Sequence, residues 1–597
     1  MIKRIEAPRI RNPRVLRSTK IPLKLWRRWI KALLPFILLF FILIVAVWPL
    51  LKSGFFITDD GEWMVVRLTD FHRSLVSGMF PIRWAARLNH QFGYPVFNFL
   101  YPLSLYWGEA FHLIGFNFVD SIKLVFVASF FLSAFFMYLF TRELWQDKRA
   151  AFLSAIFYSF APYRFLDVYV RGSIGEAVSF IFVPLIFWSL HFLSKKKNFL
   201  ILSLGAIGVA GLIMSHNIMA MLFFPLALFY AGFLISRKQS LLKDYGLLFA
   251  LGLGLAFFFW FPALYDTRFI ILNQVTVADF ANHFPTLGQL LIPSWGYGPS
   301  LVGGQDTASY QLGLFQLGAV LIALLLFWKE RQKRIYLKIF LFFFFASLFL
   351  MLPVSSFIWR NLPMIQQTQF PWRLLSVTTF SASVLAGTVL FLFKKELSKT
   401  LLTVALTVLV VLASFSYVKP KEFIDRGEGF YATNEATTTV KDEYLPIWVK
   451  QKPEARPEQR VEVIEGKAGV ENLVFNSKKA TFNVDVQEAA RLQINTVYFP
   501  GWQLKVDDEI KEILFENDRG LIIFEVDQGE HLVVVEFKET SWRLVANYIS
   551  LLSAVFVAGL IGWSLFQRLQ GKCRGSAECG IAQPRKKPSE GASFKKK

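Results

Sequence analysis

The chain has 597 residues, of which 54% are hydrophobic and only 18% are charged, and it contains 65 phenylalanines. Soluble proteins are typically about 45–50% apolar and about 25% charged. Here the apolar excess lies in long runs without charge, which are typical of membrane spans. The composition therefore excludes an ordinary soluble protein, and the net charge of +22 has to be interpreted by its distribution along the chain.

The N-terminal end is strongly basic. Residues 1–31 contain eleven Lys or Arg and a single acid, Glu6, and an apolar run follows at 32–51. The charge keeps the N-terminus in the cytoplasm, and the length of the run predicts a retained anchor rather than a cleaved signal peptide. Further spans are predicted at 119–140, 150–163, 176–193, 199–214, 218–235, 245–262, 311–328, 336–352, 373–393, 400–417 and 544–566. The fold class is therefore a polytopic α-helical membrane protein with about twelve spans.

Every second connector between these spans is predicted to be cytoplasmic, and these connectors are rich in Lys and Arg, as the positive-inside rule requires. They lie at 141–149, 195–197, 237–244, 329–334 and 394–399 and in the basic tail, 567–597. The predicted outside segments are a first loop at 53–118, loops at 164–175, 215–217, 263–310 and 353–372, and a stretch at 418–543. A transmembrane domain at 32–417 is thus followed by an external domain at 418–543 and a last span at 544–566.

The acids are distributed differently from the basic residues. More than half of the 43 acids lie between residues 420 and 542, so the external domain is acidic and the positive charge is cytoplasmic. The net charge therefore indicates orientation in a plasma membrane and contact with anionic lipids. No nucleic-acid partner is expected.

The external domain is predicted to be rich in β-strands. Segments 480–486, 491–498, 520–526 and 531–537 alternate apolar and polar residues and are separated by turn residues. This pattern favours a β-sandwich-like domain before the last span. Segment 425–460 is polar and contains proline, so it is either the start of this domain or an ordered linker.

Three carboxylates, Asp59, Asp60 and Glu62, lie within four residues where the first span ends. Neighbouring acids raise one another's pKa and offer hard oxygen ligands, so the group is suited to act as a general base or to bind a divalent cation. The alternative is structural, with Asp60 as the N-cap of a helix that begins at Gly61. The apolar spacing that follows predicts a helix over 61–77 lying on the membrane surface.

An aromatic stretch with Gly and Pro follows at 92–107. It either anchors the loop at the membrane interface or forms a platform for a sugar or a lipid chain. The predicted spans contain almost no ionisable residue near their middle, which weakens a transporter interpretation. The sequence also lacks a Gly-rich nucleotide loop of the Walker or Rossmann type.

The order of several motifs resembles the GT-C superfamily of polyprenol-dependent glycosyltransferases, in which an acidic motif ends the first span and a long external loop follows. The motifs DDGEWMVVRLTDFHRSLVSGMFPIRW, FGYPVFNFLYPL, APYRFLDVYVRGS, SHN and QFPWRLLS resemble a bacterial group labelled "6-pyruvoyl-tetrahydropterin synthase-related" membrane proteins, although no feature indicates pterin chemistry. Residues 498–508, YFPGWQLKVDD, resemble the external domain of YfhO-type membrane proteins. The resemblance spans most of residues 32–566.

The resemblance implies roles for particular residues. The first-loop acid that contacts or activates the acceptor hydroxyl corresponds to Asp60, with Asp59 beside it. Met64 stands near the place where related proteins often have a histidine, which weakens a metal role for this loop. The family's second external acid corresponds to Asp167 or Glu176. The further candidate substrate-binding residues are Glu62, Arg67, Arg164, Arg171, His216 and Arg373.

Several of these residues have a structural alternative. Arg164 and Arg171 could bind a phosphate headgroup or simply pair with Asp167. His216 could bond a phosphate or a sugar hydroxyl, or be satisfied by a backbone carbonyl. Arg373 is either a second candidate for the donor phosphate or a snorkelling residue at the interface.

These features predict a membrane glycosyltransferase that moves a sugar from a polyprenyl-phosphate donor to a glycan, lipid or protein acceptor at the outer face. The resemblance to the GT-C superfamily implies that the anomeric carbon is inverted. Two alternatives stay open: a flippase or transporter of a lipid-linked saccharide, and a non-catalytic envelope scaffold. A transporter would show charges near the middle of its spans or inverted repeats. A scaffold would keep its function without Asp60.

Overall fold

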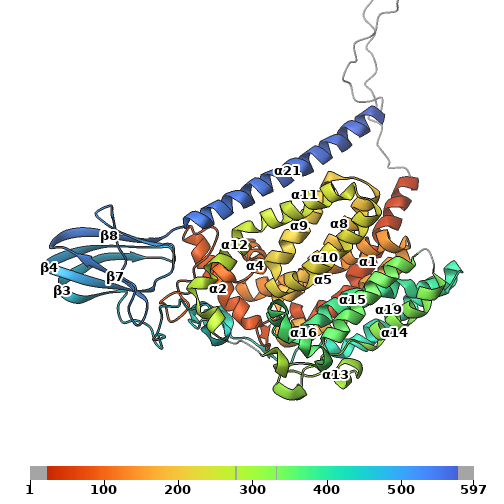
Figure 1. Ribbon diagram of the computed structural model, residues 1–597, viewed down its shortest axis with the longest axis horizontal. Coiled ribbons are helices and arrows are strands. Elements are labelled where there is room, and N and C mark those ends of the chain that lie inside the picture. Colours follow the sequence, from red (N-terminus) through yellow and green to blue (C-terminus); the bar gives the residue numbers. More distant parts are fainter. Residues whose placement is uncertain (1–22, 276–278, 331–332, 576–597) are drawn as a thin grey trace, which may run out of the picture.

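The computed structural model describes residues 23–275, 279–330 and 333–575. The predicted basic N-terminus up to residue 22, the tail from residue 576 and two residues of the predicted inner loop 329–334 lie outside the described residues. In Figure 1 a helical bundle makes up most of the molecule and a β-sheet projects from one end. Helix α21 (Ser541–Gly575) runs along the bundle from the sheet to the opposite end, where α1 (Leu23–Val47) begins.

Among the described residues, seven helices are long and apolar enough to cross a membrane. Their apolar segments are Leu33–Leu51 from α1, Phe118–Trp145 (α5), Ile174–Lys195 (α8), Asn217–Arg237 (α10), Pro371–Leu392 around α18 (Leu375–Ala386), Glu396–Tyr417 around α19 (Glu396–Ser414) and Ser541–Gln570 from α21. Because each segment can span a hydrocarbon core about 30 Å thick, the chain is a multi-pass membrane protein.

Further spans are bent or short. Helices α11 (Leu241–Leu255) and α12 (Phe257–Tyr265) meet at a bend of 66°, and a bend of 86° follows α15 (Arg334–Leu350) before α16 (Ser356–Asn361). Counting each bent pair as one span gives nine in the part of the chain that the structure describes. Shorter helices occupy the remaining predicted positions, namely α6 (Lys148–Ser159), α9 (Phe199–Ser215) and α14 (Leu314–Lys329). The total of twelve spans therefore stays a prediction.

The bundle has a protein-enclosed centre. In the most apolar stretch of Pro371–Leu392, 94% of the residues are buried, and in that of α8 83% are. The corresponding share is 22% in Glu396–Tyr417 and only 11% in the span of α21. Helix α8 and the segment around α18 therefore form the interior, while α19 and α21 lie at the periphery. Two charged residues from the sequence analysis, Glu176 and Arg373, belong to these two central segments.

The five inner connectors predicted from charge contact one another at one end of the bundle. Ion pairs join Lys195 to Glu143, Lys197 to Asp244, Arg149 to Glu396 and Lys399 to Asp147. Lys333 also donates a hydrogen bond to the Trp145 carbonyl at 3.1 Å. The described residues of the connectors that the sequence predicts to be cytoplasmic therefore lie together.

The first loop folds at the opposite end as α2 (Gly61–Val76), α3 (Val96–Phe99) and α4 (Leu103–Leu113). Helix α2 begins at Gly61, as predicted. It is not a surface helix, however, because Arg67 and Asp70 are buried together with its apolar side chains. Segment 418–460 packs over the helix and removes Arg67 and Asp70 from solvent, which the helical periodicity alone could not show.

This covering segment, 418–460, is ordered and joined to the first loop along its length. Its strand β2 (Phe423–Ile424) pairs with β1 (Phe55–Phe56), and helix α20 (Gly427–Thr433) follows. The Arg67 Nε donates to Thr438 Oγ1 at 3.0 Å, and the His90 amide donates to the Glu435 carbonyl at 3.0 Å. The polar stretch 425–460 is therefore a cover for the first loop.

The external region continues as a six-stranded antiparallel sheet. Its strands are β3 (Val461–Phe475), β4 (Lys479–Val497), β5 (Trp502–Val506), β6 (Glu509–Lys511), β7 (Leu521–Val526) and β8 (Gly529–Phe537). The predicted strands 480–486 and 491–498 are halves of β4, which pairs with β8 along its first half and with β7 along its second. All six strands thus belong to one hydrogen-bonded sheet, instead of the two sheets of the predicted sandwich.

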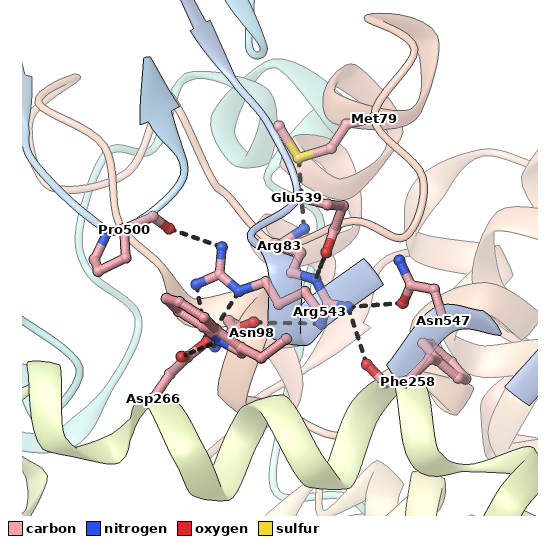
Figure 2. A network of polar contacts seen from close by, with 10 residues as sticks. Met79, Arg83, Asn98, Phe258, Asp266, Pro500, Glu539, Arg543 and Asn547 are labelled. Atoms are coloured by element: carbon pink, nitrogen blue, oxygen red, sulfur yellow. Dashed lines mark hydrogen bonds and ion pairs between the residues drawn. The ribbon is translucent and has the colours of Figure 1, made fainter. Parts of the chain in front are cut away.

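A buried polar network fixes the base of this sheet to the bundle (Figure 2). Arg543, in the first turn of α21, forms an ion pair of 2.8 Å with Asp266, and both side chains are completely buried. Arg543 also donates to the Pro500 carbonyl at 2.7 Å. Arg83 from the first loop donates to Glu539 at 2.9 Å. The network therefore ties the first loop, the end of α12, the sheet and α21 together.

We expect Asp266→Asn to lower the free energy of unfolding by about 3–5 kcal/mol, because it leaves the buried Arg543 without its countercharge. The measurement is thermal unfolding of the full chain in lipid nanodiscs. The matched control is Glu488→Gln, which breaks the exposed ion pair between Glu488 and Lys467 and leaves the transition unchanged. Equal transitions for the two variants would contradict the role given to this network.

Candidate functional site

The acidic turn of the first loop lies against the segment that precedes α8. The amide of Asp59 donates to the Val170 carbonyl at 3.2 Å, and the amide of Asp60 donates to the Arg171 carbonyl at 2.8 Å. Gly172 permits this approach, because a Cβ there would lie 2.4 Å from Thr58 Oγ1 and its φ is +67°. Two backbone bonds and a glycine thus fix the carboxylates of the first loop beside Arg171.

The side chain of Asp60 is left available by this geometry. Asp60 occupies the N-cap position of α2, but its carboxylate makes no capping bond. The Thr58 hydroxyl oxygen instead accepts from the Gly61 amide at 2.9 Å. The predicted alternative is therefore half correct: the helix begins after Asp60, yet Thr58 satisfies its first N–H. Both Asp59 and Asp60 are exposed.

Beneath these acids lies a buried charge cluster centred on Arg171. A π-helical turn, η2 (Leu166–Arg171), runs into α8, so that Asp167 comes one turn before Arg171 and Glu176 one turn after it. Arg171 pairs with Asp167 at 2.5 Å and with Glu176 at 2.8 Å. Arg373, from the segment leading into α18, lies 3.2 Å from Glu176. The cluster therefore holds two guanidinium groups against two carboxylates.

Aromatic side chains complete the cluster, although no sequence motif predicted them. The Tyr163 hydroxyl donates to Glu176 at 2.8 Å. The guanidinium of Arg171 lies 4.7 Å from the centre of the Trp372 ring, which stacks on Tyr310 at 4.8 Å. The only signal in the sequence was position, since Tyr163 and Trp372 directly precede Arg164 and Arg373 in the chain.

His216 interacts electrostatically with Glu176. Its Nδ1 accepts from the Met219 amide at 3.4 Å, so the ring caps α10, and no bond to a backbone carbonyl is formed among the described residues. The imidazole packs against Tyr101, with the ring centres 4.8 Å apart. The histidine therefore belongs to the cluster and also has a structural task.

The electrostatics of the site extend from the buried cluster to the exposed acids. The Asp59 carboxylate interacts with Arg171, and Asp60 interacts with Arg373. Desolvation by the surrounding protein raises the pKa of Asp59 to about 6, and the neighbouring Asp60 adds to the rise, while Arg171 opposes it. Asp59 therefore keeps its proton to a higher pH than an ordinary aspartate does.

Three of the predicted residues lie away from the cluster. Glu62 accepts from Arg426 and Tyr431, at 3.0 Å each, and so faces the covering segment. Arg67 bonds to Thr438 of the same segment. Arg164 is completely buried among aromatic rings, and its nitrogens have no hydrogen-bond partner among the described residues. It therefore does not pair with Asp167, in contrast to Arg171.

The acids of the first loop do not assemble into a cation cage. Within the described ranges no three His, Cys, Asp or Glu side chains are grouped so that they could hold a metal ion, and Glu62 points away from the other two. Asp59 and Asp60 could still supply two oxygen ligands, with substrate oxygens completing the coordination of a divalent cation.

Comparisons with known proteins give distant likenesses, and no family model matches the chain. An uncharacterized protein of Lactococcus lactis subsp. cremoris is 27% identical over 259 residues, which is 42% of each chain. The apo oligosaccharyltransferase of Archaeoglobus fulgidus is similar at a TM-score of 0.41 and 14% identity, covering 71% of this chain and 62% of the other. Arabinofuranosyltransferase AftD from Mycobacteria is similar at a TM-score of 0.45 and 14% identity, covering 68% and 28%.

A third structure is the archaeal oligosaccharyltransferase AglB from Archaeoglobus fulgidus in complex with an inhibitory peptide and a dolichol-phosphate, at a TM-score of 0.39 and 14% identity, covering 68% of this chain and 57% of the other. The chain thus matches less than two thirds of the length of each relative and structure. The names of these structures describe glycosyltransferases, the class that the motifs resemble. The resemblance to the pterin-labelled group and to YfhO-type proteins stays a prediction.

We expect Gly172→Ala to detach the acidic turn from the cluster, because its Cβ meets Thr58 Oγ1 and the Gly61 backbone in a conformation that costs an L-residue about 1–2 kcal/mol before any clash. The measurement is proteolytic cleavage of the first loop in nanodiscs, which should become faster. Gly246→Ala in α11 is the control, since nothing lies within 4 Å of its added Cβ. A first loop that stays equally protected in both variants would contradict the packing role of Gly172.

Proposed function

We propose that the protein is an integral membrane glycosyltransferase that moves a sugar from a polyprenyl-phosphate donor to an acceptor at the outer face of the plasma membrane. The observation that carries the proposal is the pairing of exposed acids with buried arginines. Asp59 and Asp60 are held by backbone bonds beside a cluster that contains Arg171 and Arg373. Such a site offers a proton acceptor and a phosphate-binding group at one end of an apolar bundle.

The arginines are suited to the leaving phosphate. A guanidinium group binds phosphate bidentately and keeps its charge at any physiological pH. Glu176 contacts both Arg171 and Arg373, so the guanidinium groups are fixed before substrate arrives. Preorganised charge of this kind stabilises the charge that develops in the transition state without reorganisation. The polyprenyl chain would lie in the lipid around the bundle.

The acids are suited to the acceptor. Asp60 takes the proton of the acceptor hydroxyl, whose oxygen forms a bond to the anomeric carbon of the donor sugar. The bond between that carbon and the phosphate oxygen breaks, and polyprenyl phosphate leaves with the electron pair beside Arg171 and Arg373. A single displacement inverts the anomeric carbon. Asp59, with its raised pKa, has to be charged to support the proton transfer.

The distribution of charge supports an orientation for the site. The connectors rich in Lys and Arg contact one another at the end of the bundle opposite to the first loop, and such connectors face the cytoplasm. This supports an external acidic turn, covering segment and sheet, with both termini in the cytoplasm. A glycan, a lipid or a protein of the cell envelope would then be the acceptor.

We expect Asp60→Asn to lower kcat/KM by about 10²-fold to 10⁴-fold, the usual contribution of a general base. The assay is glycosyl transfer by the purified protein in nanodiscs, with a panel of radiolabelled polyprenyl-phosphate sugars and a membrane extract as acceptor. Asp485→Asn, an exposed acid of the sheet, is the control and keeps full activity. Donor binding without transfer in any variant would favour the flippase or the scaffold, and absence of donor binding would overturn the proposal.

We expect kcat/KM to rise with pH through about 6, because Asp59 is protonated below the value to which its pKa is raised and charged above it. The profile is measured between pH 5 and pH 8, a range of about three units around that value. In Asp59→Asn the rise should disappear and the remaining activity should be flat. A rise that persists unchanged in Asp59→Asn would assign it to another group.

A further inference from the structure

One tyrosine in the aromatic stretch of the first loop has a hydroxyl group without a hydrogen-bond partner among the described residues. The Tyr94 hydroxyl lies 2.7 Å from Thr439 Oγ1, and the Tyr106 hydroxyl is hydrogen-bonded to the backbone of Ile82. The Tyr101 hydroxyl has no such partner in the part of the chain that the structure describes, and this side chain is partly exposed. Tyr101 therefore presents a polar group that is both accessible and free to bind a ligand.

Two close contacts hold the ring of Tyr101 in place. The ring packs against His216, with the ring centres 4.8 Å apart. It also lies against Gly175 in the first turn of α8, where an added Cβ would stand 2.5 Å from Tyr101 Cε2 and 2.7 Å from Tyr101 Cζ. Because Cζ carries the hydroxyl group, this contact places the hydroxyl near Glu176, the next residue of α8, with which the phenol interacts.

The backbone around Tyr101 is fixed as well. Asn98 donates a hydrogen bond to Asp266 at 2.9 Å and so joins the buried network shown in Figure 2. The Leu100 amide donates to the Val96 carbonyl at 2.8 Å at the end of α3, and α4 begins two residues after Tyr101. The phenol is therefore in position before a ligand arrives, which lowers the entropy cost of binding.

The charged groups that surround the phenol belong to both halves of the proposed reaction. From the first loop, Tyr101 interacts with Asp60, the proposed proton acceptor, and with Arg67. From the two central segments it interacts with Glu176 and Arg373, which form an ion pair in the proposed phosphate site. Burial raises the pKa of Tyr101 to about 12. The hydroxyl group therefore stays protonated at physiological pH, so that it can donate a hydrogen bond as well as accept one.

This position indicates which part of the substrate meets the hydroxyl group. In the proposed transfer the acceptor oxygen lies at Asp60, and the leaving phosphate oxygen lies near Arg373. The anomeric carbon exchanges one of these oxygens for the other, so the donor sugar has to lie between them. A neutral phenol suits a sugar hydroxyl at this place, because both groups donate and accept hydrogen bonds.

We propose that the Tyr101 hydroxyl group binds a hydroxyl group of the donor sugar and so holds the anomeric carbon between Asp60 and the phosphate site. The inference rests on the proposed function, since it concerns the sugar of the proposed donor. It makes Tyr101 a specificity-determining residue. A donor whose sugar lacks the hydroxyl group that meets Tyr101 leaves the phenol unpaired and loses affinity, whereas a change elsewhere on the sugar ring is tolerated better.

The test is equilibrium binding of radiolabelled probes to the full chain in nanodiscs, without an acceptor. Glucosyl, galactosyl and mannosyl farnesyl phosphates carry a sugar on a short polyprenyl phosphate, and methyl farnesyl phosphate has the same charge without a sugar. We expect the wild type to bind at least one sugar probe about 10-fold or more tightly than the methyl probe. Tyr101→Phe should weaken that sugar probe about 10-fold, which corresponds to about 1.4 kcal/mol, and should leave the methyl probe unchanged.

Tyr101→Phe is a mild change to the fold. The phenyl ring keeps its packing on His216 and Gly175, and the hydroxyl group that is lost has no hydrogen-bond partner among the described residues. The unfolding temperature should therefore match that of the wild type. The matched control is Tyr548→Phe, which removes the hydroxyl group of an exposed tyrosine in α21 and should change no affinity.

Four results would overturn the proposal. Tyr101→Phe could bind the sugar probes as tightly as the wild type, which would make the tyrosine purely structural. It could weaken the methyl probe as much as the sugar probes, which would place the hydroxyl group at the phosphate. The wild type could bind the methyl and sugar probes equally well. These three results leave the proposed donor site intact, whereas a wild type that binds neither kind of probe would overturn the proposed function as well.

Discussion

The arrangement at the end of the bundle that carries the first loop depends on one buried cation, Arg171. This side chain requires carboxylate partners. A guanidinium group removed from water is tolerated only when it is paired and hydrogen-bonded. Asp167 and Glu176, which lie on either side of Gly172 in the chain, form ion pairs with Arg171. Glu176 also forms an ion pair with Arg373 of the other central segment. The same pairing positions the Arg171 carbonyl, which accepts a hydrogen bond from the amide of Asp60.

The covering segment 418–460 changes the physical character of everything beneath it. Without it, α2 would be an amphipathic helix at the membrane surface, with Arg67 and Asp70 in water. With it, Arg67 bonds to Thr438, and Asp70 forms a buried ion pair of 4.0 Å with Arg87. The buried pair Arg543 and Asp266 holds the sheet, and hence the end of this cover, against the bundle. A cavity between α2, the covering segment and the turn between β3 and β4 is a consequence of that enclosure.

Much of the candidate site could be predicted because its residues come from recognisable local motifs. The helix beginning at Gly61 followed from apolar spacing, and the grouping of the inner connectors followed from their Lys and Arg content. Asp59, Asp60, Asp167, Arg171, Glu176, His216 and Arg373 do come together. Glu62, Arg67 and Arg164 do not, because the direction in which each side chain leaves its helix decides whether it faces the cluster, the covering segment or a group of aromatic rings.

The sequence by itself determined the apolar segments, their order and the alternation of strand residues, because hydrophobic periodicity and charge are properties of neighbouring residues. Only the tertiary structure decided that residues 480–497 form one strand and that six strands make one sheet. It also decided that Thr58 caps α2. Arg171 pairs with both Asp167 and Glu176, whereas Arg164 pairs with neither. These outcomes depend on contacts between residues far apart in the chain, where packing and the cost of burying charge outweigh local preference.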